Sequence, residues 1–149
     1  MTPRDQIEAL SARMSRAIIG QDKVVERLVI GLLANGNILI EGLPGLAKTR
    51  AIKAMAKNLE AEFSRIQFTP DLLPADILGT TVLTEGSDGS NKPEFLQGPV
   101  FANIVLALAV NRATPKTQSA MLEGMQEHQV TVSKNSLLYQ STPATKKTN

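Results

Sequence analysis

Residue types that often carry chemistry are scarce in this sequence. It contains no cysteine and one histidine, His128, among 149 residues. The lack of cysteine excludes disulfides, thiolate metal sites and a cysteine nucleophile, and it weakly favours a reducing compartment. One histidine also argues against a histidine-based metal site. Any catalytic or binding site must therefore be built from other residue types.

Aromatic residues, net charge and long apolar runs are also limited. The sequence has no tryptophan, one tyrosine and four phenylalanines, and 16 basic against 14 acidic residues leave a net charge of +2. This charge is too small to indicate a nucleic-acid partner. The longest apolar run, residues 104–110, is shorter than the roughly 20 residues of a membrane helix, and the polar N-terminus lacks a secretory signal. We expect no nucleic-acid partner, no membrane span and a cytoplasmic protein.

The first part of the chain predicts two helices. Thr2, Pro3 and Asp5 form an N-terminal capping pattern, and apolar residues at helical spacing follow as far as Gly20. Asp22 is in position to cap a second helix that continues to about Asn35. Because this second helix is apolar on most of its faces, we expect it to be well buried.

The rest of the chain alternates strands with helices. A Gly/Ser/Asp-rich turn at 85–91 also predicts a hairpin. The predicted elements are a strand at 38–40, a helix at 49–59, a strand at 63–68, a hairpin of 80–83 with 94–96, a strand at 104–110 and a helix at 116–127. The continuous apolar run at 104–110 is typical of an interior parallel strand. This order predicts a three-layer α/β/α fold with a parallel sheet.

A glycine-rich segment lies between the first predicted strand and the helix after it. It reads Gly42, Leu43, Pro44, Gly45, Leu46, Ala47, Lys48 and Thr49. Its glycines allow backbone N–H groups to surround phosphate oxygens, the lysine supplies charge for the β- and γ-phosphates, and the threonine hydroxyl suits Mg²⁺. The segment resembles a Walker A loop, with Ala47 where glycine is usual. The alternative is a glycine-rich turn before an ordinary helix.

Further motifs resemble the MoxR family of AAA+ ATPases over residues 18–132. They are Ile19-Gly20-Gln21, the GLPGLAKT loop, the segment RIQFTPDLLPADI at 65–77, GPVFAN at 98–103 and the stretch from Asn111-Arg112-Ala113 to Gln126-Glu127. The resemblance implies a P-loop NTPase core, a homo-hexamer, chaperone-like remodelling driven by Mg-ATP hydrolysis, and partners with von Willebrand factor A domains. It implies that Ile19, Gly20 and residues 42–49 bind ATP or ADP, that Thr49 ligates Mg²⁺, and that residues 80–97 are the helix-2 insert.

The sequence departs from this family at the end of the third predicted strand. Aligning Asn111-Arg112-Ala113 with the family puts Leu108 at the Walker B aspartate position and Ala109 at the Walker B glutamate position. The aspartate organises magnesium and the glutamate polarises the attacking water. We therefore expect impaired hydrolysis and no intact catalytic residue. Asn111 and Arg112 could face the nucleotide or a neighbouring subunit, or form a solvated turn.

The final residues also depart from the family. We interpret residues 1–136 as a partial ATPase core, without the family's sensors, arginine finger and helical lid, and residues 137–149 as a divergent, loose tail. His128 is expected to cap the end of a helix. The predicted function is a MoxR-type ATP-binding core with impaired hydrolysis, and we expect this chain to be a monomer. The alternatives are a non-hydrolysing nucleotide-binding subunit and a truncated, non-functional fragment.

Overall fold

The computed structural model describes residues 1–41, 46–127, 129–132 and 135–138. The chain divides into two compact units, Met1–Glu62 and Phe63–Asn149, and each is described by itself. In the described residues, no helix is both long and apolar enough to cross a membrane.

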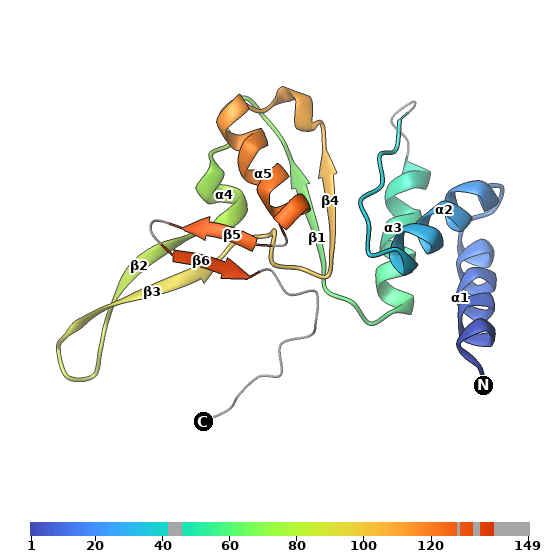
Figure 1. Ribbon diagram of the computed structural model, residues 1–149, viewed down its shortest axis with the longest axis horizontal. Helices are drawn as coiled ribbons and strands as arrows, with labels where there is room; N and C mark the ends of the chain where they lie inside the picture. The colour runs from blue at the N-terminus through green and yellow to red at the C-terminus, as the bar shows by residue number, and fades with distance from the viewer. Residues whose placement is uncertain (42–45, 128, 133–134, 139–149) are drawn as a thin grey trace. The chain divides into compact units, whose positions relative to one another are not determined.

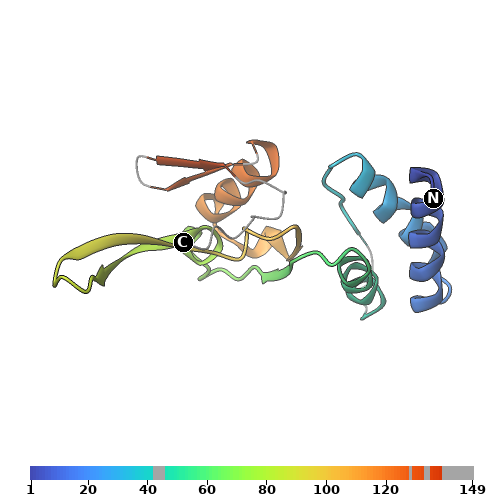
Figure 2. The ribbon, with the colours of Figure 1, turned by 90° about the horizontal axis from the view of Figure 1, so that it is seen from below.

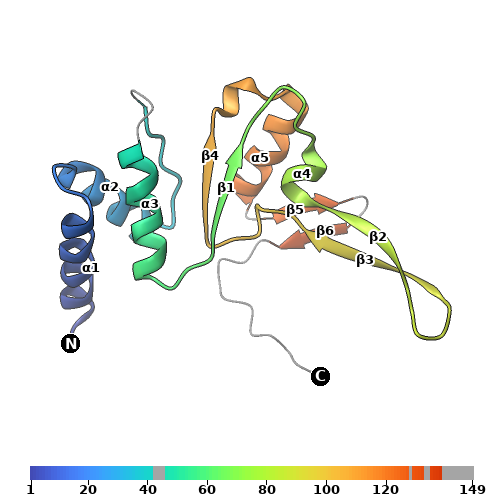
Figure 3. The same ribbon diagram turned by 180° about the vertical axis from the view of Figure 1, so that it is seen from behind.

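The first unit contains three helices that contact one another in pairs (Figures 1 and 3). They are α1 (Pro3–Ala17), α2 (Asp22–Leu33) and α3 (Leu46–Asn58). The predicted start of α1 is confirmed, because the Thr2 hydroxyl accepts a hydrogen bond from the Asp5 N–H and the Thr2 N–H donates to the Asp5 carboxylate. Arg13 of α1 also donates to the Asn58 side chain of α3, at 3.1 Å.

Each of the three helices contributes apolar side chains to the interior of this unit. The buried residues are Leu10, Met14 and Ile18 from the first helix and the turn after it, Val25, Leu28 and Val29 from the second, and Ala51, Ile52, Met55 and Ala56 from the third. Their three- and four-residue spacing is that of an amphipathic helix. Met14 and Met55 are therefore core residues of this unit.

Two expectations for α2 are wrong. Its N-cap is Gln21 rather than Asp22, which is the first helical residue. The helix is also less buried than predicted, since Ile30 is 57% exposed and Leu33 is 60% exposed. The sequence of α2 is apolar on nearly every side, so it carries no periodic signal to show which side the other helices cover.

The predicted strand at 38–40 is absent. Residues 36–41 have no regular secondary structure, and Leu39 is 83% exposed. A strand requires a neighbour for its backbone hydrogen bonds, and none of the described strands pairs with this segment. Local β-propensity is therefore not enough to make Ile38–Ile40 a strand here.

The second unit is built on a parallel pair of strands. β1 (Phe63–Gln67) pairs with β4 (Ile104–Leu108) in the register Phe63 to Ile104. After β4 come a short 3₁₀ helix, η1 (Val110–Arg112), and α5 (Pro115–Glu127). One face of the pair packs against α5 (Figure 2), in a cluster of Ile66, Phe68, Ile77, Leu78, Val100, Ala113, Ala120 and Met121, with Val105 and Ala107 packed against it. The α/β class and the parallel pairing are as predicted.

A hairpin extends from this unit, as predicted (Figure 1). The short helix α4 (Pro74–Leu78) leads into β2 (Gly79–Glu85), which pairs antiparallel with β3 (Asn91–Gln97). Glycine is required at the base of the hairpin, because Gly79 has φ +106° and a Cβ there would clash with the Leu96 carbonyl. The hairpin is largely exposed, and Leu83 is 71% exposed.

A second antiparallel pair follows α5. It consists of β5 (Gln129–Val132) and β6 (Asn135–Leu138). Leu137 and Leu138, which were expected to begin a loose tail, are instead part of a strand. The rest of that tail, 139–149, and the predicted helix cap His128 lie outside the described residues.

Candidate nucleotide-binding site

Lys48 and Thr49 lie in the first turn of α3. Both residues are half-buried, whereas the loop residues Gly42, Leu43, Pro44 and Gly45 lie outside the described part of the chain, as do the side chains of Leu46 and Ala47. The Lys48 ammonium donates a hydrogen bond to the carbonyl oxygen of Glu41, at 3.1 Å. This bond joins the residue before the glycine-rich loop to the helix after it. Lys48 is thereby held at the base of the loop.

The charge along α3 favours an anion at its N-terminus. Its sequence, LAKTRAIKAMAKN, contains four basic residues and no acidic one. The unpaired N–H groups at a helix N-terminus carry a partial positive charge, which adds to the charge of Lys48. With no carboxylate in the first turn to neutralise this field, the helix start is suited to phosphate.

These residues fit a nucleotide phosphate better than they fit a complete magnesium site. The Lys48 ammonium and the N–H groups of the α3 start are anion donors, and a phosphate oxygen could replace the Glu41 carbonyl as the lysine's acceptor. Thr49 supplies a hydroxyl oxygen, the type of ligand Mg²⁺ prefers. Among the described residues, no group of three or more acidic, histidine or cysteine side chains could hold a metal ion.

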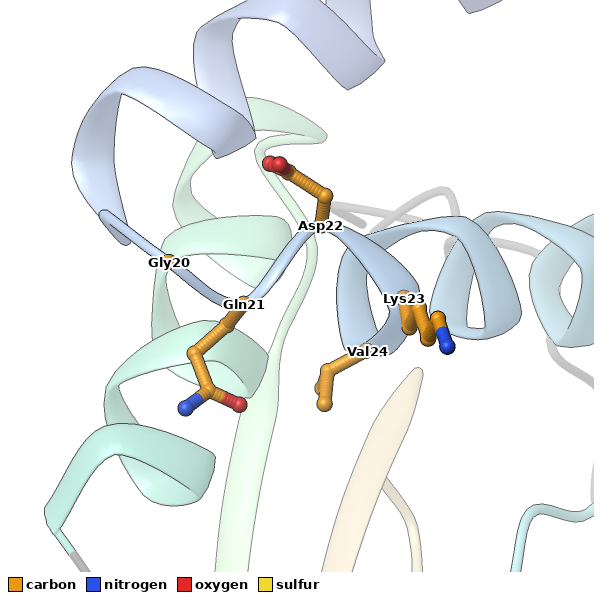
Figure 4. Close-up of a pocket in the computed structure, with 5 residues that line it drawn as sticks. All are labelled: Gly20, Gln21, Asp22, Lys23 and Val24. Atoms are coloured by element: carbon orange, nitrogen blue, oxygen red, sulfur yellow. The ribbon is translucent and has the colours of Figure 1, made fainter.

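A pocket of about 450 Å³ lies at the start of α2, in the same unit. It is lined by Gly20, Gln21, Asp22, Lys23 and Val24 (Figure 4). Gln21 and Val24 point to the same side of the turn, and Asp22 points away from them (Figure 4). The pocket is wide open, so it is a surface hollow into which part of a ligand could fit.

The turn before this pocket contains the two other predicted nucleotide-binding residues. Ile19 is 92% exposed, and Gly20 has φ +79°. A Cβ at Gly20 would meet no atom within 4 Å, so the backbone conformation alone favours glycine here. An exposed isoleucine beside a pocket can contact the apolar part of a ligand. Gln21 and Val24 also line this pocket, and their positions after the Ile19-Gly20 turn could have indicated them.

The end of β4 carries no carboxylate. Leu108 is the last residue of the strand, is half-buried, and accepts a hydrogen bond through its carbonyl from the Phe68 N–H at 3.0 Å. Ala109 follows with φ 55° and ψ 43°, a left-handed conformation that ends the strand. The predicted strand at 104–110 is therefore two residues too long. Asn111 and Arg112 are exposed on η1.

The RIQFTPDLLPADI segment at 65–77 builds the connection from β1 to α4. Phe68 and Ile77 are fully buried in the core. Between them, the Thr69 side chain donates a hydrogen bond to Asp71 and lowers the pKa of that carboxyl below its usual value, with a smaller contribution from the Asp71 N–H. The Asp76 carboxylate accepts from the Leu73 N–H at 2.8 Å, at the start of α4. This segment is thus fixed by its own hydrogen bonds.

The predicted site residues fall into both units. Ile19, Gly20, Lys48 and Thr49 belong to the first unit, while Leu108 and Ala109 belong to the second. Within the first unit, Lys48 is placed at the α3 N-terminus and Gly20 beside the pocket. The start of α3 and the end of β4 are therefore separate local features, and phosphate binding by residues 42–49 stays a prediction.

Comparisons with known proteins agree with the sequence motifs. Residues 37–144 match the family described as "ATPase family associated with various cellular activities (AAA)". The chain is 47% identical over 126 residues to Chaperone MoxR1 of Mycobacterium tuberculosis, covering 85% of this chain and 33% of that protein. It is 30% identical over 132 residues to Protein MoxR of Methylorubrum extorquens, covering 85% of this chain and 37% of that protein.

A solved structure has the same fold. The crystal structure of a candidate ATPase from Cytophaga hutchinsonii superposes with a TM-score of 0.79 at 43% identity, covering 92% of this chain and 41% of that one. The chain spans about a third of the length of the MoxR relatives. The family match and these relatives together show that the chain belongs to the MoxR family of AAA+ ATPases.

Proposed function

We propose that this chain binds ATP or ADP through residues 42–49, with its phosphates at the N-terminus of α3. The observation that carries this proposal is the hydrogen bond from Lys48 to the Glu41 carbonyl, at the start of a helix with no acidic residue. Ile19 and Gly20 would contact the rest of the nucleotide, beside the pocket at the start of α2. Thr49 would supply one oxygen to Mg²⁺.

Hydrolysis is proposed to be impaired. The end of β4 presents Leu108 and Ala109, which offer neither an oxygen for the magnesium shell nor a base for water. This observation favours a nucleotide-binding subunit that does not hydrolyse ATP over a hydrolysing ATPase core. If the chain were a non-functional fragment, it would bind no nucleotide at all.

Chaperone-like remodelling is proposed from the relatives. One of them is named a chaperone, and the chain spans only about a third of it. A ring of six subunits and partners with von Willebrand factor A domains are part of the same proposal. Of these proposed properties, nucleotide binding is the one to test first, because it can be measured on this chain alone.

Titration calorimetry with ATP and with ADP tests the binding proposal. The variants are Lys48→Ala and, as a matched control, Lys57→Ala, which removes an exposed lysine from the last turn of the same helix. A hydrogen bond from a charged group contributes about 1.5–3 kcal/mol, so Lys48→Ala should weaken binding by about tenfold or more. Lys57→Ala should leave binding unchanged. Equal heats for the wild type and Lys48→Ala would remove α3 from the proposed site.

A further inference from the structure

The β2–β3 hairpin is joined to the rest of its unit at two neighbouring points (Figure 1). α4 runs directly into β2, and the chain after β3 returns through Gly98 to the buried Val100. A two-stranded hairpin attached in this way could bend at its base or be held in one direction. The contacts at the base decide between these two arrangements.

Two glycines, Gly79 and Gly98, lie against each other at this base. The Gly98 N–H donates a hydrogen bond to the Leu78 carbonyl at 3.1 Å. A Cβ at Gly98 would overlap the carbonyl oxygen of Ile77 and the backbone nitrogen of Gly79. Both are backbone groups, which cannot rotate away as the end of a flexible side chain can. Glycine is therefore required at position 98 by the close approach of backbone to backbone.

The residues on either side of the two glycines are fixed in the core. Ile77 is fully buried, Val100 is buried, and the Val100 N–H donates to the Ile77 carbonyl at 3.2 Å. The chain that enters the hairpin is therefore hydrogen-bonded to the chain that leaves it, on the core side of the glycines. Phe95 and Phe101 make an edge-to-face contact across the same joint, with their ring centroids 6.0 Å apart.

The residues that anchor the hairpin also pack with α5. Ile77 and Val100 share one buried cluster with Ala120 of α5. A Cβ at Gly124 of α5 would meet the Val100 side chain at 3.5 Å, an ordinary van der Waals distance. The hairpin base and α5 are thus parts of one close-packed interior, and such interiors transmit a displacement rather than absorb it.

We propose that the β2–β3 hairpin is a preorganised arm, whose direction relative to α5 is fixed by the contact of Gly98 with Ile77 and Gly79. The arm moves together with α5 instead of bending at its base. Because the seven residues of β2 span roughly 20 Å, a rotation of about 10° displaces the tip by about 3–4 Å. The arm does not depend on nucleotide binding, and it gives the proposed remodelling activity a lever that carries a displacement of α5 to the hairpin tip.

The distance between a spin label on the hairpin tip and one on α5 tests this arm. The chain has no cysteine, so Ser87→Cys in the hairpin turn and Ser119→Cys on α5, both at exposed positions, provide the two label sites. The labelled chain should give one narrow distance distribution. Adding Gly98→Ala should shift the mean distance by at least about 3 Å or roughly double the width, because the new Cβ forces the end of β3 away from α4. Adding Gly124→Ala, the matched control, should change neither quantity, because its Cβ has room.

Three results of this experiment would overturn the proposal. They are a broad or two-peaked distribution for the labelled chain, an unchanged distribution for Gly98→Ala, and a change for Gly124→Ala as large as that for Gly98→Ala. If Gly98→Ala does not fold, amide hydrogen exchange of the unsubstituted chain decides. The Gly98 and Val100 amides should exchange within about tenfold of the slowest α5 amides, because the joint opens only when α5 does. Exchange faster than this limit would show that the hairpin bends at its base.

Discussion

Thr117 is the one buried polar residue of the described core, and it connects two motifs. Its side chain is fully buried, and its hydroxyl donates to the Leu72 carbonyl at 2.7 Å while accepting from the Thr114 hydroxyl at 3.2 Å. Leu72 belongs to the family segment at 65–77, and Thr117 lies on α5. One hydroxyl thus joins the segment after β1 to the helix after β4.

Thr117→Val keeps the shape of the side chain and removes this hydroxyl. A hydrogen bond contributes about 0.5–1.5 kcal/mol net, and an unpaired buried carbonyl costs about 1–3 kcal/mol. Because Leu72 is half-buried, water can partly replace the lost partner of its carbonyl, which lowers the penalty. We therefore expect Thr117→Val to lower the free energy of unfolding by about 1–2 kcal/mol. Thr117→Ser keeps the hydroxyl and loses one methyl group, at about 0.8 kcal/mol.

Hydrogen exchange of the α5 amides in a urea series measures this loss. The chain has no tryptophan to report unfolding, and it divides into two compact units. Amides within α5 report on the unit that contains Thr117. Thr81→Val, at an exposed position on the hairpin, is the control and should change α5 protection little. If Thr117→Val protects α5 as well as the wild type does, or better than Thr117→Ser does, the Leu72 hydrogen bond does not stabilise this unit.

Two further predictions concern the end of β4. Ala109→Gly should raise the free energy of unfolding by up to about 1 kcal/mol in the same exchange assay, because alanine is strained at φ 55°; a destabilised variant would contradict this reading of Ala109. Phosphate release from ATP should be at background for the wild type. It should become measurable in the double variant Leu108→Asp with Ala109→Glu, where Lys48→Ala should abolish it. Wild-type turnover that Lys48→Ala abolishes would refute the assigned role of Leu108 and Ala109.

Features with a local cause could be predicted from the sequence. The Thr2–Asp5 cap depends on side chains three residues apart, and the structure shows the predicted bonds. The β2–β3 hairpin depends on the turn residues between its strands, and it forms as predicted. The parallel pairing of β1 with β4 could also be inferred, because a continuous apolar strand with a helical connection favours a parallel neighbour.

Features that depend on distant partners could not be predicted in the same way. Ile38–Ile40 has strand composition but no described strand beside it, so its backbone stays irregular. The exposed side of α2 depends on which faces α1 and α3 cover, and its nearly uniform apolar sequence holds no such information. For the site, Lys48 and Thr49 could be placed at a helix start, and Gln21 belongs to the Ile19-Gly20-Gln21 motif. The pocket-lining Val24 belongs to no motif, and only its position after that motif points to it.

The backbone at Ala109 adds a second argument for the proposed loss of hydrolysis, beyond the missing acids. β4 ends at Leu108, and Ala109 turns the chain into η1 with a left-handed conformation. Glutamate is not among the residues enriched in that conformation, so a glutamate at 109 would be strained there or would require the strand to extend by one residue. The proposed phosphate-binding residues Lys48 and Thr49 lie on α3, in a different unit from this strand end. We therefore expect changes at the end of β4 to remove hydrolysis while leaving the proposed anion site at Lys48 intact, which is the behaviour of a subunit that binds nucleotide without turning it over.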